Sequence, residues 1–66
     1  MEKEIEKIVD KMISIGSDKK HTFLEVFDSL LEIKDYRLDI LASIPEILAL
    51  RGYDIANKNY FELIKY

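Results

Sequence analysis

Hydrophobic and polar positions between residues 22 and 52 follow a helical period, and this stretch holds most of the large apolar side chains. Apolar residues recur at spacings of three, four and seven residues, which places them on one side of a helix. That side covers roughly 160° of the helix surface, whereas an ordinary amphipathic helix needs about 100°. The opposite side is acidic and carries Glu25, Asp28, Glu32, Asp35 and Asp39. The pattern predicts a long central helix with a wide apolar front and an acidic back.

Start and stop signals set the bounds of this central helix at residues 23–43. Thr22 and Glu25 form a capping box, in which the hydroxyl and the carboxylate satisfy free amides of the first turn. Asp35 could cap a new helix, but no Gly or Pro interrupts the stretch there and the apolar positions keep their phase. We therefore expect one continuous helix. Pro45 should end or sharply kink it, because the proline ring removes an amide and disfavours a helical residue before it.

Shorter helices are expected on either side of this central helix. Residues 2–15 repeat apolar positions at helical spacing, and Gly16 is well placed to end that helix in a left-handed conformation. Pro45 can begin a short helix that Gly52 ends. The expected helices are residues 2–15, 23–43, 45–51 and 58–65. Because no strand alternation extends beyond a few residues, the expected fold class is all-α: a single domain, residues 1–66, built as a bundle of about four helices around the second one.

The size of the chain limits how much of its apolar surface can be buried. A domain of 66 residues is near the lower end of what folds alone, and it buries only about 60% of the surface that its unfolded chain exposes. Yet 48% of its residues are hydrophobic. Either part of the apolar surface stays exposed, or a second copy or another protein covers it.

The charge balance makes nucleic acid and membranes poor partners. The net charge is −3, with ten basic residues against thirteen acidic ones, so the chain can neutralise few phosphates. No apolar run approaches the roughly 18 residues of a membrane span, and the charged N-terminus does not resemble a signal peptide. We therefore expect a cytoplasmic protein, and the absence of cysteine fits a reducing compartment.

The sequence contains no recognisable catalytic or metal-binding motif. His21 is the only histidine, no nucleophile is indicated beside it, and one imidazole does not make a zinc site. The two glycines do not form a phosphate-binding loop. The acidic residues lack the spacing and the glycine turn of a calcium loop. We expect no cofactor, no metal and no enzymatic activity.

The expected function is protein binding by a small acidic regulator or inhibitor. One margin of the apolar front should stay uncovered by the short flanking helices, and it could form a homodimer or contact a larger protein. Tyrosines near the C-terminus add favoured interface side chains, with Phe61 expected inside and Tyr66 outside. The candidate interface is Val26, Ile33, Tyr36, Ile40, Tyr53, Tyr60 and Tyr66. The acidic back of the central helix is a second candidate, as a docking ridge for a basic partner.

One segment resembles a known family. The residues from Ser43 to Ile64, SIPEILALRGYDIANKNYFELI, resemble the helix, Gly-Tyr turn and second helix of winged-helix repressors such as the arginine repressor. Gly52 and Tyr53 fall at the turn of that pattern. The segment departs from the family because its first helix is short, no basic wing follows, and the second helix has no arginine to read a guanine edge. The resemblance implies an alternative function, a helix-turn-helix DNA-binding regulator that uses these residues.

Overall fold

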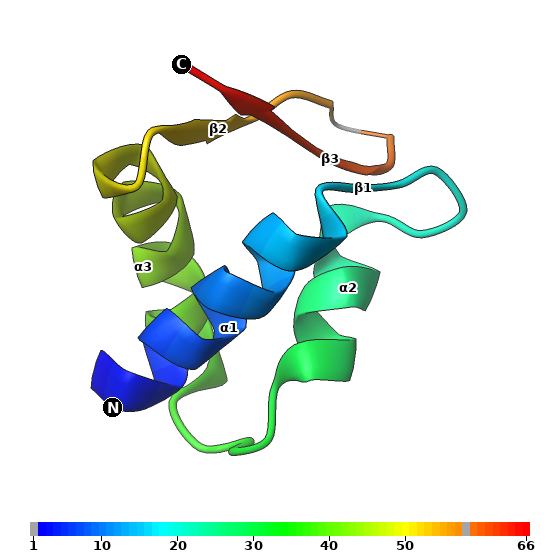
Figure 1. Ribbon diagram of the computed structural model, residues 1–66. Coiled ribbons are helices and arrows are strands. Elements are labelled where there is room, and N and C mark those ends of the chain that lie inside the picture. The colour runs from blue at the N-terminus through cyan, green and yellow to red at the C-terminus, as the bar shows by residue number, and fades with distance from the viewer. Residues whose placement is uncertain (1, 58) are drawn as a thin grey trace.

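The computed structural model describes residues 2–57 and 59–66, which form three helices and three short strands (Figure 1). In chain order the elements are α1 (Glu2–Ile15), β1 (Ser17–Asp18), α2 (Phe23–Leu30), α3 (Arg37–Leu50), β2 (Tyr53–Ile55) and β3 (Phe61–Lys65). The fold is therefore α+β, and the expected all-α bundle of four helices is wrong. The first expected helix, residues 2–15, is confirmed as α1.

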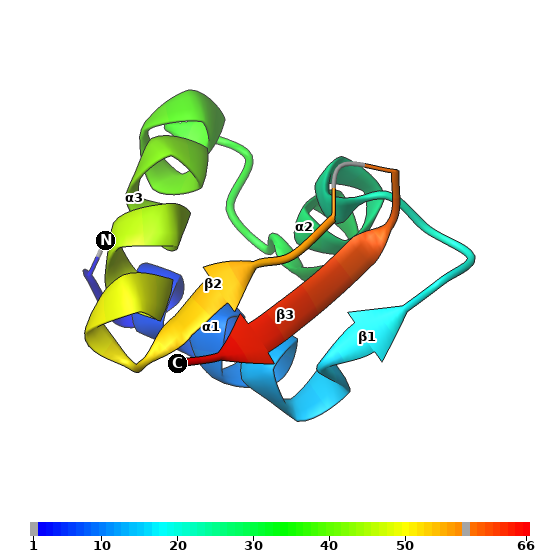
Figure 2. The ribbon, with the colours of Figure 1, turned by 90° about the horizontal axis from the view of Figure 1, so that it is seen from above.

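The three strands form an antiparallel sheet with β3 in the middle. Asp18 of β1 lies opposite Phe61, and Ile55 of β2 lies opposite Leu63. Seen from above, the sheet lies across one end of the helices (Figure 2). This position lets Phe61 enter the core with its side chain fully buried, while Leu63 packs against the core from its edge.

The C-terminal segment was expected to be a helix over residues 58–65, and this expectation is wrong where it can be checked, because residues 61–65 form β3. Its first residue, Lys58, lies outside the described residues. Phe61 and Leu63, two residues apart, contact the core. Ile64, which lies between them and the C-terminus, is half exposed to solvent. A short apolar run fits a strand and a helix equally well by periodicity alone. Pairing with β1 on one side and β2 on the other favours the strand.

The long central helix expected at residues 23–43 is also wrong. Helix α2 ends at Leu30, and α3 starts at Arg37 after a connection in which Tyr36 adopts a left-handed backbone conformation with φ of 60°. A straight helix could turn only part of its wide apolar front toward α1. The break lets two helices face the same core, so that α2 and α3 both bury their apolar sides against α1. In Figure 1, α1 lies in front, with α3 to its left and α2 to its right; Figure 2 shows both behind α1.

Pro45 neither ends a helix nor begins one. It lies inside α3, so the short helix expected at residues 45–51 is the second half of a longer helix. Pro45 is on the exposed side of α3. Gly52 follows with φ of 86° and supplies the left-handed residue that the helix end requires, as expected.

The core is a single cluster of side chains from all three helices, the α2–α3 connection and β3. Its buried members are Ile5, Ile8, Val9, Met12, Val26, Phe27, Leu31, Ile40, Ile44, Leu48 and Phe61. None of the described residues buries a polar or charged side chain. The capping box at Thr22 and Glu25 is confirmed: the Thr22 hydroxyl accepts from the Glu25 amide at 3.2 Å, and Glu25 accepts from the Thr22 amide at 2.8 Å.

The segment from Ser43 to Ile64 does not form a helix-turn-helix, because it contains the second half of α3 followed by β2 and β3. The two helices joined by a short connection are instead α2 and α3.

Candidate protein-binding surface

The residues expected to form an interface are divided between core and surface. Val26 and Ile40 are buried, with 4% and 1% of their surface exposed, so the expected uncovered strip cannot include them. Both belong to the core cluster, Val26 from α2 and Ile40 from α3. Ile33 and Tyr36 remain exposed in the α2–α3 connection. Tyr53 and Tyr60 are half-buried, whereas Tyr66 is exposed and Phe61 buried, as expected.

The acidic residues do not form one continuous ridge, because they belong to different elements. Several of them hold the fold together: Glu25 caps α2, Asp28 pairs with Arg37, and Glu32 lies 3.3 Å from the Lys7 amine. Asp35 lies in the α2–α3 connection, and Asp39 is exposed on α3. The carboxylates therefore act mostly in separate local contacts rather than as one surface.

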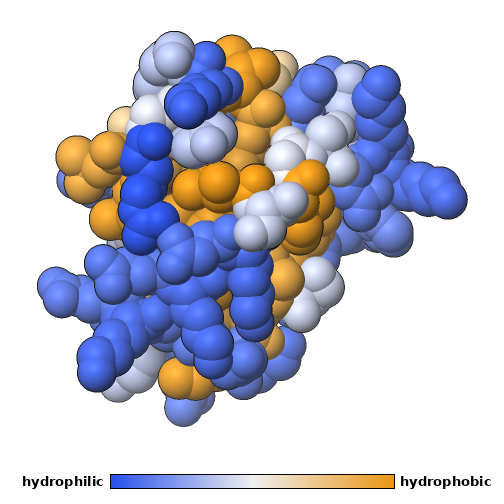
Figure 3. All heavy atoms as spheres, viewed as in Figure 1, coloured by the Kyte–Doolittle hydropathy of each residue, from blue (hydrophilic) through white to orange (hydrophobic). Residues whose placement is uncertain are grey.

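Large apolar side chains remain exposed, as the composition predicts. They are Ile15, Leu24, Ile33, Tyr36, Leu38, Leu50, Ile64 and Tyr66. Figure 3 shows apolar atoms in a band between α1 and the sheet, next to a hydrophilic surface along α1. The most exposed aliphatic side chains of this set belong to α3, where 72% of the surface of Leu38 and 78% of that of Leu50 is exposed.

The outward face of α3 is a surface that the sequence pattern missed. We define it by the exposed residues of this helix: Leu38, Asp39, Ala42, Pro45, Glu46, Ala49 and Leu50. A continuous helix would have placed Leu38 on the apolar front, seven residues after Leu31. The break rotates α3, so that Ile40, Ile44 and Leu48 are buried and Leu38 is turned to solvent. The all-round apolar composition of α3 was the signal for a second apolar face.

The outward face of α3 has no cation of its own, and the arginines at the two ends of the helix are engaged elsewhere. Arg37 donates to Asp28 from Nε at 2.7 Å and from Nη2 at 2.9 Å. Arg51 forms an ion pair with Asp10 on α1. Hydrogen bonds to these carboxylates raise the pKa of both guanidinium groups. The charges left on the face are the carboxylates of Asp39 and Glu46.

A hollow of about 350 Å³ lies where the α2–α3 connection meets α1 and the start of α3. It is lined by Glu4, Ile33, Asp35, Tyr36 and Ile40. We call it the Tyr36 hollow. Three residues of the expected interface meet here: Ile33, Tyr36 and the buried Ile40. Its walls are mainly apolar, while both of its charged residues are acidic.

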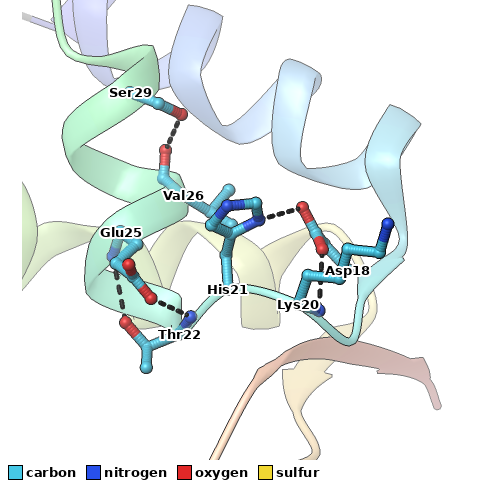
Figure 4. Close-up of polar contacts among 7 residues, drawn as sticks. All are labelled: Asp18, Lys20, His21, Thr22, Glu25, Val26 and Ser29. Carbon is cyan, nitrogen blue, oxygen red and sulfur yellow. Dashed lines mark hydrogen bonds and ion pairs between the residues drawn. The ribbon is translucent and has the colours of Figure 1, made fainter.

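His21 lies just before α2 and contacts the Asp18 carboxylate (Figure 4). Its Nδ1 lies 2.9 Å from Oδ2 of Asp18, whose other oxygen accepts from the Lys20 amide at 3.0 Å. The amide hydrogen bond and His21 lower the pKa of Asp18. Asp18, His21 and Ser29 line a small hollow of about 160 Å³. The Ser29 hydroxyl donates its proton to the Val26 carbonyl at 2.7 Å. This arrangement orders the β1–α2 loop.

Residues 2–57 and 59–66 were compared with the geometry of metal sites and of membrane-spanning helices. No group of three or more His, Cys, Asp or Glu side chains there is arranged to hold a metal ion. None of the helices in this described part has the length and apolarity to cross a bilayer. Comparisons with protein-family models, curated proteins and solved structures gave no match. A function therefore has to be inferred from the surface itself.

Proposed function

We propose that this chain is a small non-enzymatic protein-interaction module, a regulator or inhibitor that binds a larger protein through the outward face of α3. One observation carries the proposal. The second helix of the α2–α3 pair exposes Leu38 and Leu50 beside small residues, with carboxylates and no cation on the same face. An exposed apolar helix face with a polar margin is typical of a protein-binding surface.

The same helix is poorly suited to DNA, which is the alternative function. In a helix-turn-helix protein the second helix enters the major groove and presents donors to bases and phosphates. Here Asp39 and Glu46 would face the phosphates, and the arginines at both ends of α3 are paired with carboxylates. Such a face would repel a duplex rather than neutralise it.

Self-association is the other form that protein binding could take. Two copies meeting through the outward face of α3 would bring together four carboxylates, from Asp39 and Glu46 of each copy. Like charges across an interface oppose association. We therefore favour a different protein as the partner, one that presents lysine or arginine around an apolar contact.

A photo-crosslinking amino acid placed at Ala42 tests this proposal in lysate of the native host. We expect one larger protein to be captured from this position, but not from the matched exposed position Ala56 in the β2–β3 connection. Leu38→Ser should abolish the capture without unfolding the chain, since Leu38 is exposed. Equal capture from both positions would refute the proposal. A cytoplasmic location, expected from the sequence, belongs to the same proposal and can be tested by cell fractionation.

A sequence-dependent complex with duplex DNA would instead support the alternative function. Fluorescence anisotropy at roughly 150 mM salt is the appropriate measurement, because non-specific phosphate binding weakens steeply with salt. We expect no binding in the micromolar range. Tight binding that survives this salt concentration would replace the protein-binding proposal by the DNA-binding one.

A further inference from the structure

We propose that the Tyr36 hollow is a second binding site, which takes a bulky apolar side chain flanked by lysine or arginine from an extended segment of a partner protein. This inference shares with the proposed function the premise that the chain binds proteins, but it concerns a separate site. It names the chemistry of the bound segment.

The shape of the hollow suits a single anchoring side chain. Its volume of about 350 Å³ is at the lower end of the roughly 300–1,000 Å³ that is usual for small-ligand sites. Ile33 supplies an exposed aliphatic wall, and Ile40 also lines the hollow but is a core residue with only 1% of its surface exposed. An apolar side chain entering here would cover Ile33, which is 49% exposed.

Tyr36 borders the hollow and has a left-handed backbone conformation. Its φ of 60° is unusual for a bulky residue, and strained conformations of this kind persist when the surrounding structure fixes them. The Tyr36 carbonyl accepts from the Ile40 amide at 2.9 Å, so the residue also begins α3. Tyr36 stays 67% exposed at the border of the hollow. A tyrosine side chain has only two χ angles, so it loses little entropy when a partner binds.

The charges of the hollow select a basic segment. Glu4 and Asp35 are the charged residues that line it, and both are acidic. One oxygen of Glu4 accepts from the Glu32 amide at 3.3 Å, and the Glu32 carboxylate is itself paired with Lys7 and Lys11, at 3.3 and 3.7 Å. A cation next to the anchoring side chain could form a charge-assisted hydrogen bond with either carboxylate. A segment with acidic neighbours would be repelled.

The test is a titration of the ¹⁵N-labelled full chain, followed by amide chemical shifts, with three capped tripeptides. The first has phenylalanine between two lysines, the second phenylalanine between two glutamates, and the third alanine between two lysines. We expect the first to shift amides near Ile33, Tyr36 and Ile40, with an affinity at least tenfold higher than the other two. Equal shifts with the glutamate peptide, or shifts centred elsewhere, would overturn the proposal.

Variants of the hollow sharpen this test. Asp35→Asn should weaken binding of the lysine–phenylalanine peptide several-fold, and Tyr36→Gly should abolish it, since glycine accepts the positive φ and keeps the fold. Leu24→Ser, on the exposed side of α2, is the matched control and should bind as the wild type does. Shifts of the same amides with protein concentration alone would mean that a second copy fills the hollow, and would refute the proposal.

The peptide titration and the crosslinking at Ala42 test different surfaces, so a negative result in one leaves the other result unaffected. Loss of the peptide signal with capture at Ala42 retained would remove only the Tyr36 hollow as a binding site. Retained peptide binding without capture at Ala42 would remove the outward face of α3 and leave the hollow. The two surfaces are therefore separable by experiment.

Discussion

Arg37 holds Asp28 through two parallel hydrogen bonds, Nε to Oδ1 at 2.7 Å and Nη2 to Oδ2 at 2.9 Å. This bidentate pair joins the last turn of α2 to the first residue of α3 across the connection between them. The Arg37 guanidinium also lies 5.7 Å from the centre of the Phe27 ring. The pair therefore fixes the angle between the two helices, and with it the outward face of α3.

Breaking this pair should lower the melting temperature by a few degrees and loosen the angle between the helices. Arg37→Lys is the informative change, because a lysine keeps the charge but loses the planar fork that matches a carboxylate. Asp28→Asn should have a similar effect, and the double variant should be no worse than either single one. Thermal unfolding followed by circular dichroism measures this. Asp39→Asn, at an exposed position on α3, serves as the control. Fully additive effects would show that the two side chains do not interact.

Stability should fall in acid because four carboxyl groups accept hydrogen bonds that need the charged form. The pKa is lowered for Asp18, Glu25, Asp28 and Glu32. The largest cause is a backbone amide for the first two residues and a basic side chain for the last two. A lowered folded pKa adds stability above the unfolded value of about 4, and this stability is lost as the pH falls through the folded pKa.

Urea unfolding at a series of pH values measures this loss. We expect a constant midpoint from pH 7 to about pH 5 and a steady decline below about pH 4.5, where carboxylates begin to protonate. The double variant Asp28→Asn, Glu32→Gln should start lower at neutral pH and decline less steeply. A wild-type midpoint that rises in acid would show that repulsion among the acidic residues outweighs these hydrogen bonds.

Local signals in the sequence were sufficient to predict one helix, one helix cap and two glycine conformations. Helix α1, the capping box at Thr22 and the positive φ of Gly16 and Gly52 follow from spacing, capping and glycine alone. The break before α3 has no such signal. Lys34 and Asp35 keep the helical phase, and Tyr36 is a residue that rarely adopts a positive φ. The break is favoured by tertiary packing, since it buries two helix faces where a straight helix could bury one.

The strands were missed for the same physical reason. Ser17 and Asp18 have little strand propensity, and they become β1 because β3 lies next to them. The candidate binding site was only partly predicted. Ile33 and Tyr36 were expected at the surface and are exposed, but their partners in the Tyr36 hollow, Glu4 and Ile40, come from elements whose arrangement depends on the break.

Pro45→Ala should stabilise the fold. Pro45 lies inside α3 on its exposed side, where it removes one helical hydrogen bond to the Leu41 carbonyl and contributes little packing. Alanine restores the amide, and proline in a helix interior is less favourable than alanine by up to about 3 kcal/mol. Urea unfolding measures the gain. Ser43→Ala, two residues earlier, is a control that leaves the backbone hydrogen bonds unchanged. A loss of stability would mean that the proline bend is needed to place β2.

Tyr36→Gly should also stabilise the chain, by up to about 1 kcal/mol. A left-handed conformation costs a residue with a side chain about 1–2 kcal/mol, and glycine avoids this cost while losing some entropy of its own. The Tyr36 ring is 67% exposed, so its removal sacrifices little burial. Tyr36→Asn should have an intermediate effect, because asparagine tolerates this region better than tyrosine does. If Tyr36→Gly destabilises the chain, the ring contributes more to packing than its exposure indicates.

The chain should remain monomeric up to hundreds of micromolar, because Asp39 and Glu46 keep two copies of α3 apart. The outward face has enough apolar surface to associate, since Leu38 and Leu50 are both largely exposed. Neutralising the charges in Asp39→Asn, Glu46→Gln should therefore produce concentration-dependent dimers, which light scattering on a size-exclusion column detects. A matched double variant elsewhere, Asp54→Asn, Glu62→Gln on the sheet, changes the net charge equally and should stay monomeric. If both variants dimerise, net charge rather than the α3 face controls association. If the wild type dimerises at micromolar concentration, the carboxylates do not prevent it, and a second copy becomes the favoured partner of this face.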